Sequence, residues 1–399
     1  MIRKLLFFVL AIVVSVYAES YLSLYYPLGT PLQTSTGSAR SMGGSGTGVK
    51  ESFFGISLNP ANIANHEKSV FSSVASFDVN SYNDTERHYF YNFSPSMLSL
   101  IVPVGAFGNL GFSFANRTKG DLNFRSVEEL QSPVPESTDT LYTGLIRKGG
   151  MNEWQAGWGY HLANDIQIGF TYKRLYYSMQ TDRVYGFASG ESSYYHEIQR
   201  NTEETFAANG VKVGAILPWG DLTLGAAGEY VFVNESDIVN SNKLREDTIS
   251  NKSNVTIHPP PSATIGLSYQ LTSEWLLAAD IHTVLWDRFI SDDNSSLRRT
   301  YSTSAGARYI PSPEYIFATD YWRTIQYSTG LRYEQMPVEG ASEVTFTLGT
   351  ALPIQQSSAL LNIGFEYSRR RDTNLNDFTE DVFRLVIGLN GSQKWFQNR

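Results

Sequence analysis

The chain has 399 residues, no cysteine and a formal net charge of −8. The lack of cysteine excludes disulfide bonds, thiolate metal sites and lipid attachment at a cysteine, and the acidic charge argues against nucleic acid as a partner. Aromatic residues make up 14% of the chain and charged residues only 18%, a composition typical of strands that meet a bilayer interface.

The N-terminus has the pattern of an export signal. Arg3 and Lys4 precede an unbroken apolar run over 5–14, and Ala18 offers a small side chain for cleavage. A membrane-spanning helix needs roughly 20 apolar residues, so this run is too short to be one. We expect residues 1–18 to be a cleaved signal peptide, the alternative being an uncleaved anchor. Removing the two basic residues gives the mature chain a charge of 29 − 39 = −10.

Strand-like alternation runs through most of the chain after residue 68. The stretch 166–173 shows it, with one apolar and one small or polar face (Ile166, Ile168, Phe170 and Tyr172 against Gln167, Gly169, Thr171 and Lys173). Throughout the chain the second face is mostly Gly, Ser, Thr and Gln. Apolar side chains toward lipid and small or polar ones toward a lumen are the pattern of a transmembrane barrel. The alternative is a large soluble sandwich or a soluble barrel.

Fourteen such segments are expected, at 69–79, 96–104, 110–116, 153–161, 166–180, 206–217, 222–233, 262–270, 275–286, 301–310, 324–334, 343–352, 359–369 and 382–390. Short connections (105–109, 162–165, 218–221, 271–274, 353–358) alternate with long polar ones (116–150, 180–205, 234–258, 287–300), as periplasmic turns and external loops do in outer-membrane barrels. The predicted fold is all-β: a 14-stranded antiparallel transmembrane β-barrel over residues 69–399, preceded by an N-terminal extension and plug over 19–68.

Aromatic residues near the predicted strand ends are expected to form girdles at the level of the lipid headgroups. They are Tyr176, Tyr177, Trp219, Trp275, Trp286, Tyr309, Tyr321, Trp322 and Tyr333.

The stretch 38–64 has no alternation. It begins rich in glycine, then gathers apolar residues, and ends at Asn59-Pro60. A barrel of fourteen strands is too wide for its own side chains to fill, so we expect this stretch to enter the lumen from the periplasmic side and plug it. Its glycines allow close backbone approach, and its apolar side chains need a surface such as a hydrophobic ligand pocket. The alternative is a turn and short helix with no gating role.

The run from Ala39 to Gly46 (ARSMGGSG), followed by Asn59-Pro60-Ala61, resembles the N-terminal hatch of FadL-type outer-membrane transporters. The resemblance implies fourteen strands, passive transport of hydrophobic compounds such as long-chain fatty acids, and membrane lipid and a hydrophobic small molecule as partners. Where that family has acidic residues, this chain has Val49, Lys50, Glu51 and Ser52. The expected hatch residues are Ser41, Gly43, Gly44, Gly46, Phe53, Phe54, Asn59, Pro60 and Ala61.

Motifs of catalysis are missing from the sequence: it has no Gly-x-Ser-x-Gly elbow, no His-Glu-x-x-His and no phosphate loop. We therefore expect no enzyme activity, no cofactor and no metal. His282 lies two positions from Asp280 on a predicted lumenal face, and we interpret the pair as a solvated lumen contact rather than an acid–base dyad.

Two functions remain open at the bacterial outer membrane. The first is passive transport of a hydrophobic compound, with Lys173, Arg308 and Arg332 as candidates to bind an acidic head group inside the lumen. The second is a structural or scaffold barrel of a secretion or surface-attachment machinery, whose long external loops bind protein partners.

Overall fold

The computed structural model describes residues 26–51, 53–83, 87–131, 138–189, 197–244, 247–254, 259–289, 297–313, 320–354, 358–374 and 378–394. The predicted signal peptide lies outside this part of the chain. The strands are β1 (Thr30–Pro31), β2 (Ser69–Asn83), β3 (Arg87–Pro103), β4 (Asn109–Gln131), β5 (Thr138–His161), β6 (Gln167–Ser189), β7 (Glu197–Trp219), β8 (Leu222–Leu244), β9 (Asp247–Asn254), β10 (Ser262–Gln270), β11 (Trp275–Val284), β12 (Thr300–Tyr309), β13 (Gln326–Gln335), β14 (Ala341–Ile354), β15 (Ala359–Asp372) and β16 (Phe378–Gln393).

The described helices are all short. They are α2 (Gly37–Ser41) and the 3₁₀ turns η2 (Pro60–Ala64), η3 (Gly105–Phe107), η4 (Ala163–Asp165), η5 (Trp286–Arg288) and η7 (Tyr321–Thr324). None of the helices in the described ranges is long and apolar enough to cross a membrane.

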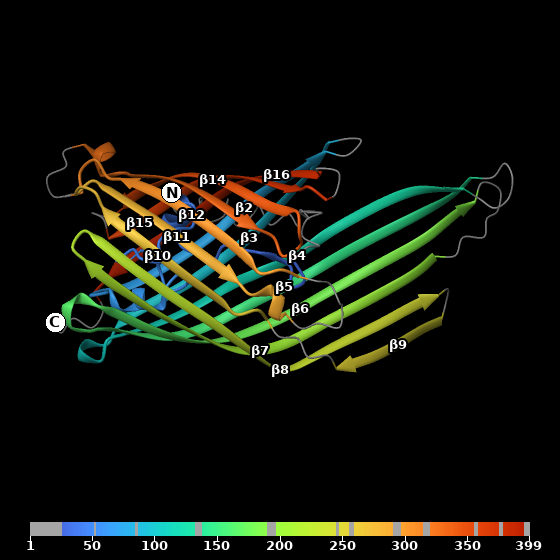
Figure 1. Cartoon of the computed structure of the whole chain (residues 1–399), viewed down its shortest axis with the longest axis horizontal. Coiled ribbons are helices and arrows are strands. Elements are labelled where there is room, and N and C mark those ends of the chain that lie inside the picture. The colour runs from blue at the N-terminus through green and yellow to red at the C-terminus, as the bar shows by residue number, and fades with distance from the viewer. Residues whose placement is uncertain are drawn as a thin grey trace, which may run out of the picture.

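Antiparallel pairing closes the strands into one barrel (Figure 1). Two of the sixteen strands lie off the ring, because β1 only pairs with β4 and β9 only with β8. The other fourteen close it through the pairing of β16 with β2. The predicted fourteen-stranded antiparallel barrel is confirmed, including the weakly alternating β12.

Side chains on the barrel strands sort by polarity as the alternation predicts. Trp154, Phe170 and Ile265 point outward and are 59%, 42% and 67% exposed. Their lumenal neighbours are buried and polar, as Gln155 and Thr171 show. Hydrocarbon on the outside accounts for this direction, because each unpaired polar group would cost several kcal/mol there.

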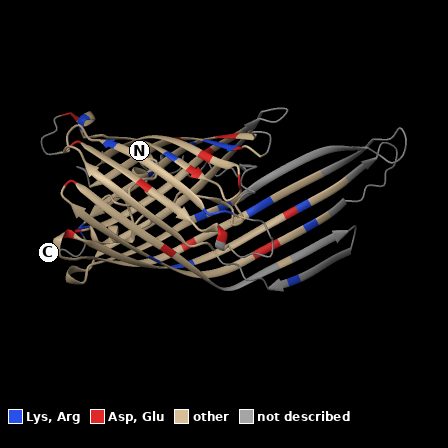
Figure 2. Ribbon diagram, in the orientation of Figure 1, with Lys and Arg blue, Asp and Glu red and all other residues tan. Residues whose placement is uncertain are grey.

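The barrel is much taller on one side than on the other. Strands β4 to β8 have 23 or 24 residues each, whereas β10 to β13 have 9 or 10. A bilayer needs only about 9 to 11 residues of a tilted strand. The tall strands therefore continue for roughly 40 Å beyond it, at about 3.3 Å per residue. We call this part of β4–β8, together with β9, the extension; it runs past the other strands in Figures 1 and 2.

The extension corrects the prediction of long polar loops at 116–150, 180–205 and 234–258. The described residues of these stretches form the far halves of the hairpins β4–β5, β6–β7 and β8–β9. The ends that carry the extension lie opposite the short turns, which by the usual arrangement of outer-membrane barrels is the cell-surface side.

The wall is incomplete between β3 and β4. Their pairing runs from Pro103↔Asn109 to Met97↔Ala115 and stops there, although both strands continue. A register shift between Val74 and Ala75 on β2 leaves one extra residue in β3 at this level, which bends the strand away. We call the opening the β3–β4 seam.

Residues 37–64, which we call the inner segment, lie against opposite inner walls of the barrel. Helix α2 packs against β13–β16 and η2 against β4–β7. Glycines of the wall make room for it: a Cβ added at Gly169 would overlap Pro60, and one added at Gly330 would overlap Gly43, well inside the 3.0 Å that real Cβ atoms keep.

Replacing Gly169 by Val is expected to lower the free energy of unfolding by about 1–3 kcal/mol, because the side chain overpacks the contact with Pro60. Denaturant unfolding of the purified protein in lipid vesicles measures this. The control is Gly228→Val, since nothing lies within 4 Å of a Cβ added there. Equal stability of the two variants would show that the inner segment does not pack tightly on the wall.

Candidate functional site

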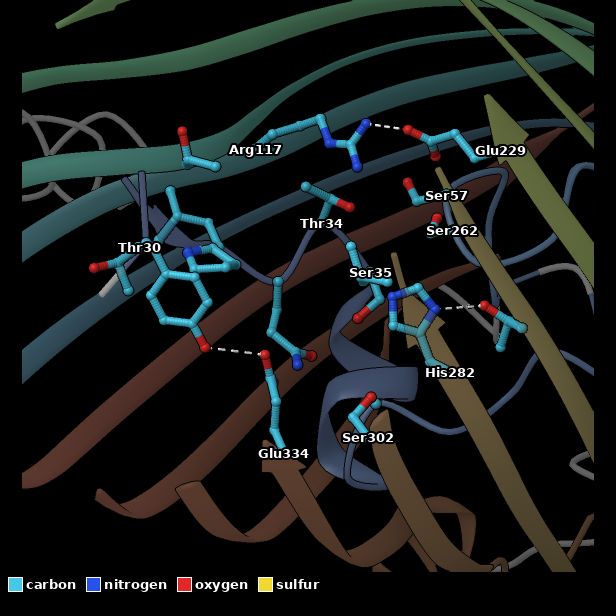
Figure 3. A pocket seen from close by; sticks show the side chains of 18 of the residues that line it. Thr30, Thr34, Ser35, Ser57, Arg117, Glu229, Ser262, His282, Ser302 and Glu334 are labelled. Atoms are coloured by element: carbon cyan, nitrogen blue, oxygen red, sulfur yellow. Dashed lines mark hydrogen bonds and ion pairs between the residues drawn. The ribbon is translucent and has the colours of Figure 1, made fainter. Parts of the chain in front are cut away.

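The lumen contains a cavity of about 320 Å³ between the inner segment and residues 26–35. Many of its lining side chains carry hydroxyl groups, among them Thr30, Thr34, Ser35, Ser57, Ser262 and Ser302 (Figure 3). Charged side chains from several strands join them. Apolar side chains such as Leu28, Leu175 and Val231 complete the lining. The cavity, which we call the chamber, therefore has both polar and apolar walls.

Residues 26–35 bound the cavity toward the cell-surface end of the lumen. The Tyr26 ring packs 6.4 Å from that of Trp286, and its hydroxyl donates to Glu334 at 3.2 Å. The carbonyl oxygen of Tyr26 accepts from Arg147 at 3.2 Å. Residues 26–35, which lead into the stretch 38–64, thus lie at the end of the lumen away from the short turns.

A cluster of three cations and two carboxylates lies on the wall formed by β4–β8. The Lys173 Nζ lies 3.2 Å from Glu153 and 2.9 Å from Glu229. Arg117 bridges the same two carboxylates, at 3.0 Å from Glu153. Lys212 donates to the Ser57 carbonyl oxygen in the inner segment. Because two carboxylates face three cations, the cluster keeps one net positive charge.

The opposite wall carries a chain of buried ion pairs that includes the inner segment. Arg40 makes a two-point contact with Glu366, at 2.8 and 3.1 Å. Arg384 lies 2.8 Å from the same Glu366 and 2.7 Å from Asp78. Arg40 is 2% exposed, so this contact fixes α2 to the wall with fully desolvated, charge-assisted bonds.

Asp280 holds the glycine-rich turn of the inner segment. Its Oδ2 accepts from the backbone nitrogens of Gly46 and Thr47, both at 3.0 Å, and from the Thr47 hydroxyl at 2.8 Å. His282 instead contacts the Thr264 hydroxyl at 2.8 Å. The two side chains therefore serve separate partners and do not form a dyad, but Asp280 is buried and not solvated as predicted.

The predicted hatch residues all lie inside the barrel. Ser41 ends α2, and its carbonyl oxygen accepts from Thr347, whose hydroxyl also accepts from the Gly43 nitrogen. Gly43, Gly44 and Gly46 have φ values of 73°, 83° and 144°, which favour glycine. Phe54 is fully buried beside Met42, Val49 and Leu276, whereas Phe53 is half-buried. Apolar parts of the wall and of the segment itself thus cover Phe54.

Asn59 begins η2 and ties it to two other segments. Its Oδ1 accepts from the Ala61 nitrogen at 3.0 Å, while its Nδ2 donates to the carbonyl oxygens of Thr47 and Ala215. Pro60 occupies the first helical position, where no N–H is needed. These contacts fix the Asn-Pro-Ala turn near the end of the inner segment.

The three head-group candidates lie in the lumen, and each has a carboxylate partner. Lys173 contacts Glu153 and Glu229, as described above. Arg308 pairs with Glu51 of the inner segment and lies 6.0 Å from the Phe54 ring centre. Arg332 lies 3.1 Å from Glu343. Alternation predicted the direction of these side chains, but their carboxylate partners were not predicted.

An apolar cluster at the cell-surface end of the lumen was missed. It includes Tyr26, Leu28, Leu175, Tyr177, Met179, Phe206, Val231, Trp286 and Met336. Two members, Tyr177 and Trp286, were expected in the lipid-facing girdles but are 3% and 8% exposed, so that prediction was wrong for them. Their neighbours Tyr176 and Trp275 do face outward. The signal was available, because from Leu175 on β6 the lumenal face changes from polar to apolar.

The chamber can accept a small solute, and the apolar cluster beside it can contact a nonpolar group. In the described residues, no group of three or more His, Asp or Glu side chains is placed to hold a metal ion.

Comparison with solved structures shows the fold. A FadL homologue from Pseudomonas aeruginosa matches with a TM-score of 0.63 and 14% identity, covering 92% of this chain and 99% of that one. The toluene transporter TbuX of Ralstonia pickettii matches with 0.60 and 14%, covering 92% and 99%. The monoaromatic hydrocarbon channel CymD matches with 0.59 and 13%, covering 93% and 100%. The chain thus has the barrel fold of FadL-like outer-membrane proteins.

Sequence comparison adds a family. The family model described as BamG matches residues 1–217 and 224–399. Among curated proteins, none matches the sequence. The resemblance to FadL-type transporters therefore holds for the fold, whereas the family match is to BamG.

Replacing Glu366 by Ala is expected to lower the free energy of unfolding by about 3–5 kcal/mol, because it leaves the Arg40 guanidinium buried without its carboxylate. Denaturant unfolding in lipid vesicles measures the loss. The control is Asp287→Ala, which breaks an exposed pair with Arg299 and is expected to cost less than about 1 kcal/mol. Restoration of part of the stability by the added change Arg40→Met would show that the unpaired charge is the cause.

Proposed function

The chain belongs to the BamG family, and we propose from its structure that it is an outer-membrane scaffold barrel that holds its extension outside the cell for partner proteins. The observation that carries this proposal is the length of β4–β8, about twice what the bilayer requires. A transport channel does not need a sheet that continues roughly 40 Å beyond the membrane, whereas a platform for partner proteins does.

The packing of the inner segment supports the same function. This segment contacts both walls, its charged side chains are paired, and wall glycines let its backbone approach closely. Such contacts make the barrel a rigid base, since closely packed interiors transmit force with little deformation. In this function the hatch residues hold the inner segment on the barrel wall and do not move as a gate.

Trimming the extension tests the scaffold. The variant lacks residues 121–148, 181–202 and 238–253, and an Asn-Gly turn closes each gap between paired residues such as Gly120 and Gly149. We expect the wild-type protein to migrate on native gels of gently solubilised outer membranes well above its own 44.6 kDa. The trimmed protein is expected to migrate as the free barrel.

The control carries the same Asn-Gly insertions without the deletions, and both proteins are first checked for a folded barrel by resistance to SDS at room temperature. A trimmed protein that remains in the large complex would rule out docking through the extension.

The second candidate is passive transport of a hydrophobic compound, with a fatty acid as one substrate class. It is favoured by the apolar cluster that borders the chamber, and by the fold shared with hydrocarbon channels. In this function the inner segment is the hatch. Lys173, Arg308 and Arg332 would bind an acidic head group after exchanging their present carboxylate partners. Membrane lipid would supply or receive the compound.

Transport predicts that the detergent-purified protein contains a stoichiometric hydrophobic molecule detectable by mass spectrometry. It also predicts that deletion of Ser41–Ala61 changes uptake of that molecule into vesicles. A scaffold predicts neither result. The matched control for uptake is the variant with the trimmed extension, which leaves the inner segment and the chamber in place.

A further inference from the structure

The edge of β4 that faces the β3–β4 seam is mostly unpaired. Toward β3, its pairing ends at Ala115. Beyond that point the only strand on this edge, among the described residues, is the two-residue β1, with Thr30 opposite Lys119 and Pro31 opposite Thr118. From Gly120 to Gln131 the other edge pairs with β5 throughout, so this stretch is one side of a regular sheet.

The free backbone groups on this edge can be assigned. Leu32 donates to the Arg117 carbonyl oxygen at 2.7 Å, and Thr30 lies opposite Lys119, so the backbone groups of Lys119 face β1. Successive residues of a strand direct their N–H and C=O groups to opposite sides. From Lys119 onward every second residue therefore faces the seam, which gives Asp121, Asn123, Arg125, Val127 and Glu129. Their intervening neighbours face β5.

Residues 30–32 of the chain itself show that this edge accepts an added strand. Residues 30–32 lie along β4 as an antiparallel strand. At Gly29 the backbone turns away with φ of 86°, and the Gly29 nitrogen donates to the Tyr26 carbonyl oxygen at 3.0 Å. Tyr26 and Leu28 enter the lumenal apolar cluster instead. Among the described N-terminal residues, only 30–32 lie on this edge, at its start.

We propose that the β4 edge from Gly120 to Gln131 binds an extended segment of a partner protein as an added β-strand. The position selects a polypeptide over a lipid. These residues lie beyond the stretch of about 9–11 that the bilayer requires, and unsatisfied N–H and C=O groups in a row are the template for strand addition. The far end of β3, from Arg87 to Ser96, makes no backbone pairs with β4 in the described structure. The side chains of Asn116 and Lys119 contact Pro95 and Asn92 across the base of the seam, and the proposed stretch begins beyond them.

This inference deepens the proposed scaffold function by naming how a partner is held. Backbone pairing makes the site tolerant of partner sequence, since the bonds involve main-chain groups alone. It also predicts a pattern that no side-chain contact would produce, because alternate amides of one strand should respond differently to the partner.

Amide hydrogen exchange in three preparations tests the proposal: the protein in native outer-membrane vesicles, the purified protein in detergent, and the purified protein in liposomes of the extracted lipids. In all three, the amides of 122, 124, 126 and 128 should exchange slowly because they bond to β5. The amides of Asp121, Asn123, Arg125, Val127 and Glu129 should be protected at least tenfold in the native vesicles only. Equal exchange of this second set in all preparations, or protection in liposomes as well, overturns the proposal.

Proline substitution separates this inference from the scaffold itself. Asn123→Pro with Arg125→Pro removes two donors from the seam side and leaves the ladder to β5 intact. The control is Asn123→Ala with Arg125→Ala, which keeps both N–H groups. We expect the proline variant to leave the large native complex and the alanine variant to remain in it. If both remain while the trimmed extension does not, the scaffold stands and strand addition at this edge is refuted.

Discussion

A closed ring of strands has to be complete only where lipid surrounds it, and the rest of the structure depends on this constraint. Within the bilayer every backbone group must be paired, and the pairing of β16 with β2 closes the ring there. The β3–β4 ladder stops at Ala115, and beyond it the Arg117 carbonyl oxygen accepts from Leu32 instead. Above the bilayer water can satisfy a free edge. Strands there are free to continue, stop or separate, so the ring tolerates ten-residue strands such as β11 beside the 24-residue β5.

The same ring is too wide for its own side chains to pack the lumen. The inner segment packs into the lumen through close backbone contacts and through buried ion pairs. Glycines of the wall admit its backbone, and the bond between Arg40 and Glu366 joins residues 326 positions apart in the chain. A buried pair of this kind is weak evidence for stability, but it specifies one position for the segment, since removing either partner leaves an unpaired charge. The tall wall thereby gains a fixed base.

The membrane-spanning part of the fold could be predicted from sequence, because hydrocarbon outside the barrel requires apolar side chains on the outer face of each strand and leaves the polar ones to the lumen. Lys173, Arg308 and Arg332 were placed in the lumen for this reason. Outside the bilayer that rule stops. The upper hairpins read as polar loops, and Tyr177 and Trp286 were assigned to the lipid face although they pack in the lumen. Alternation assigns a face to a residue but no partner across the lumen, so the pairs of Lys173 with Glu229 and of Arg40 with Glu366 could not be foreseen.

The unpaired edge of β4 lies beyond the bilayer, where lipid does not require it to be paired. Soluble sheets normally protect an edge with a bulge, a proline or a covering segment, and here the proline of β1 lies at the start of the edge. Among the described residues, this protection covers only the part nearest the membrane. If the edge were only a by-product of uneven strand lengths, protection would be expected where exposure is greatest. Its confinement to the base fits an edge that is kept unpaired for a partner.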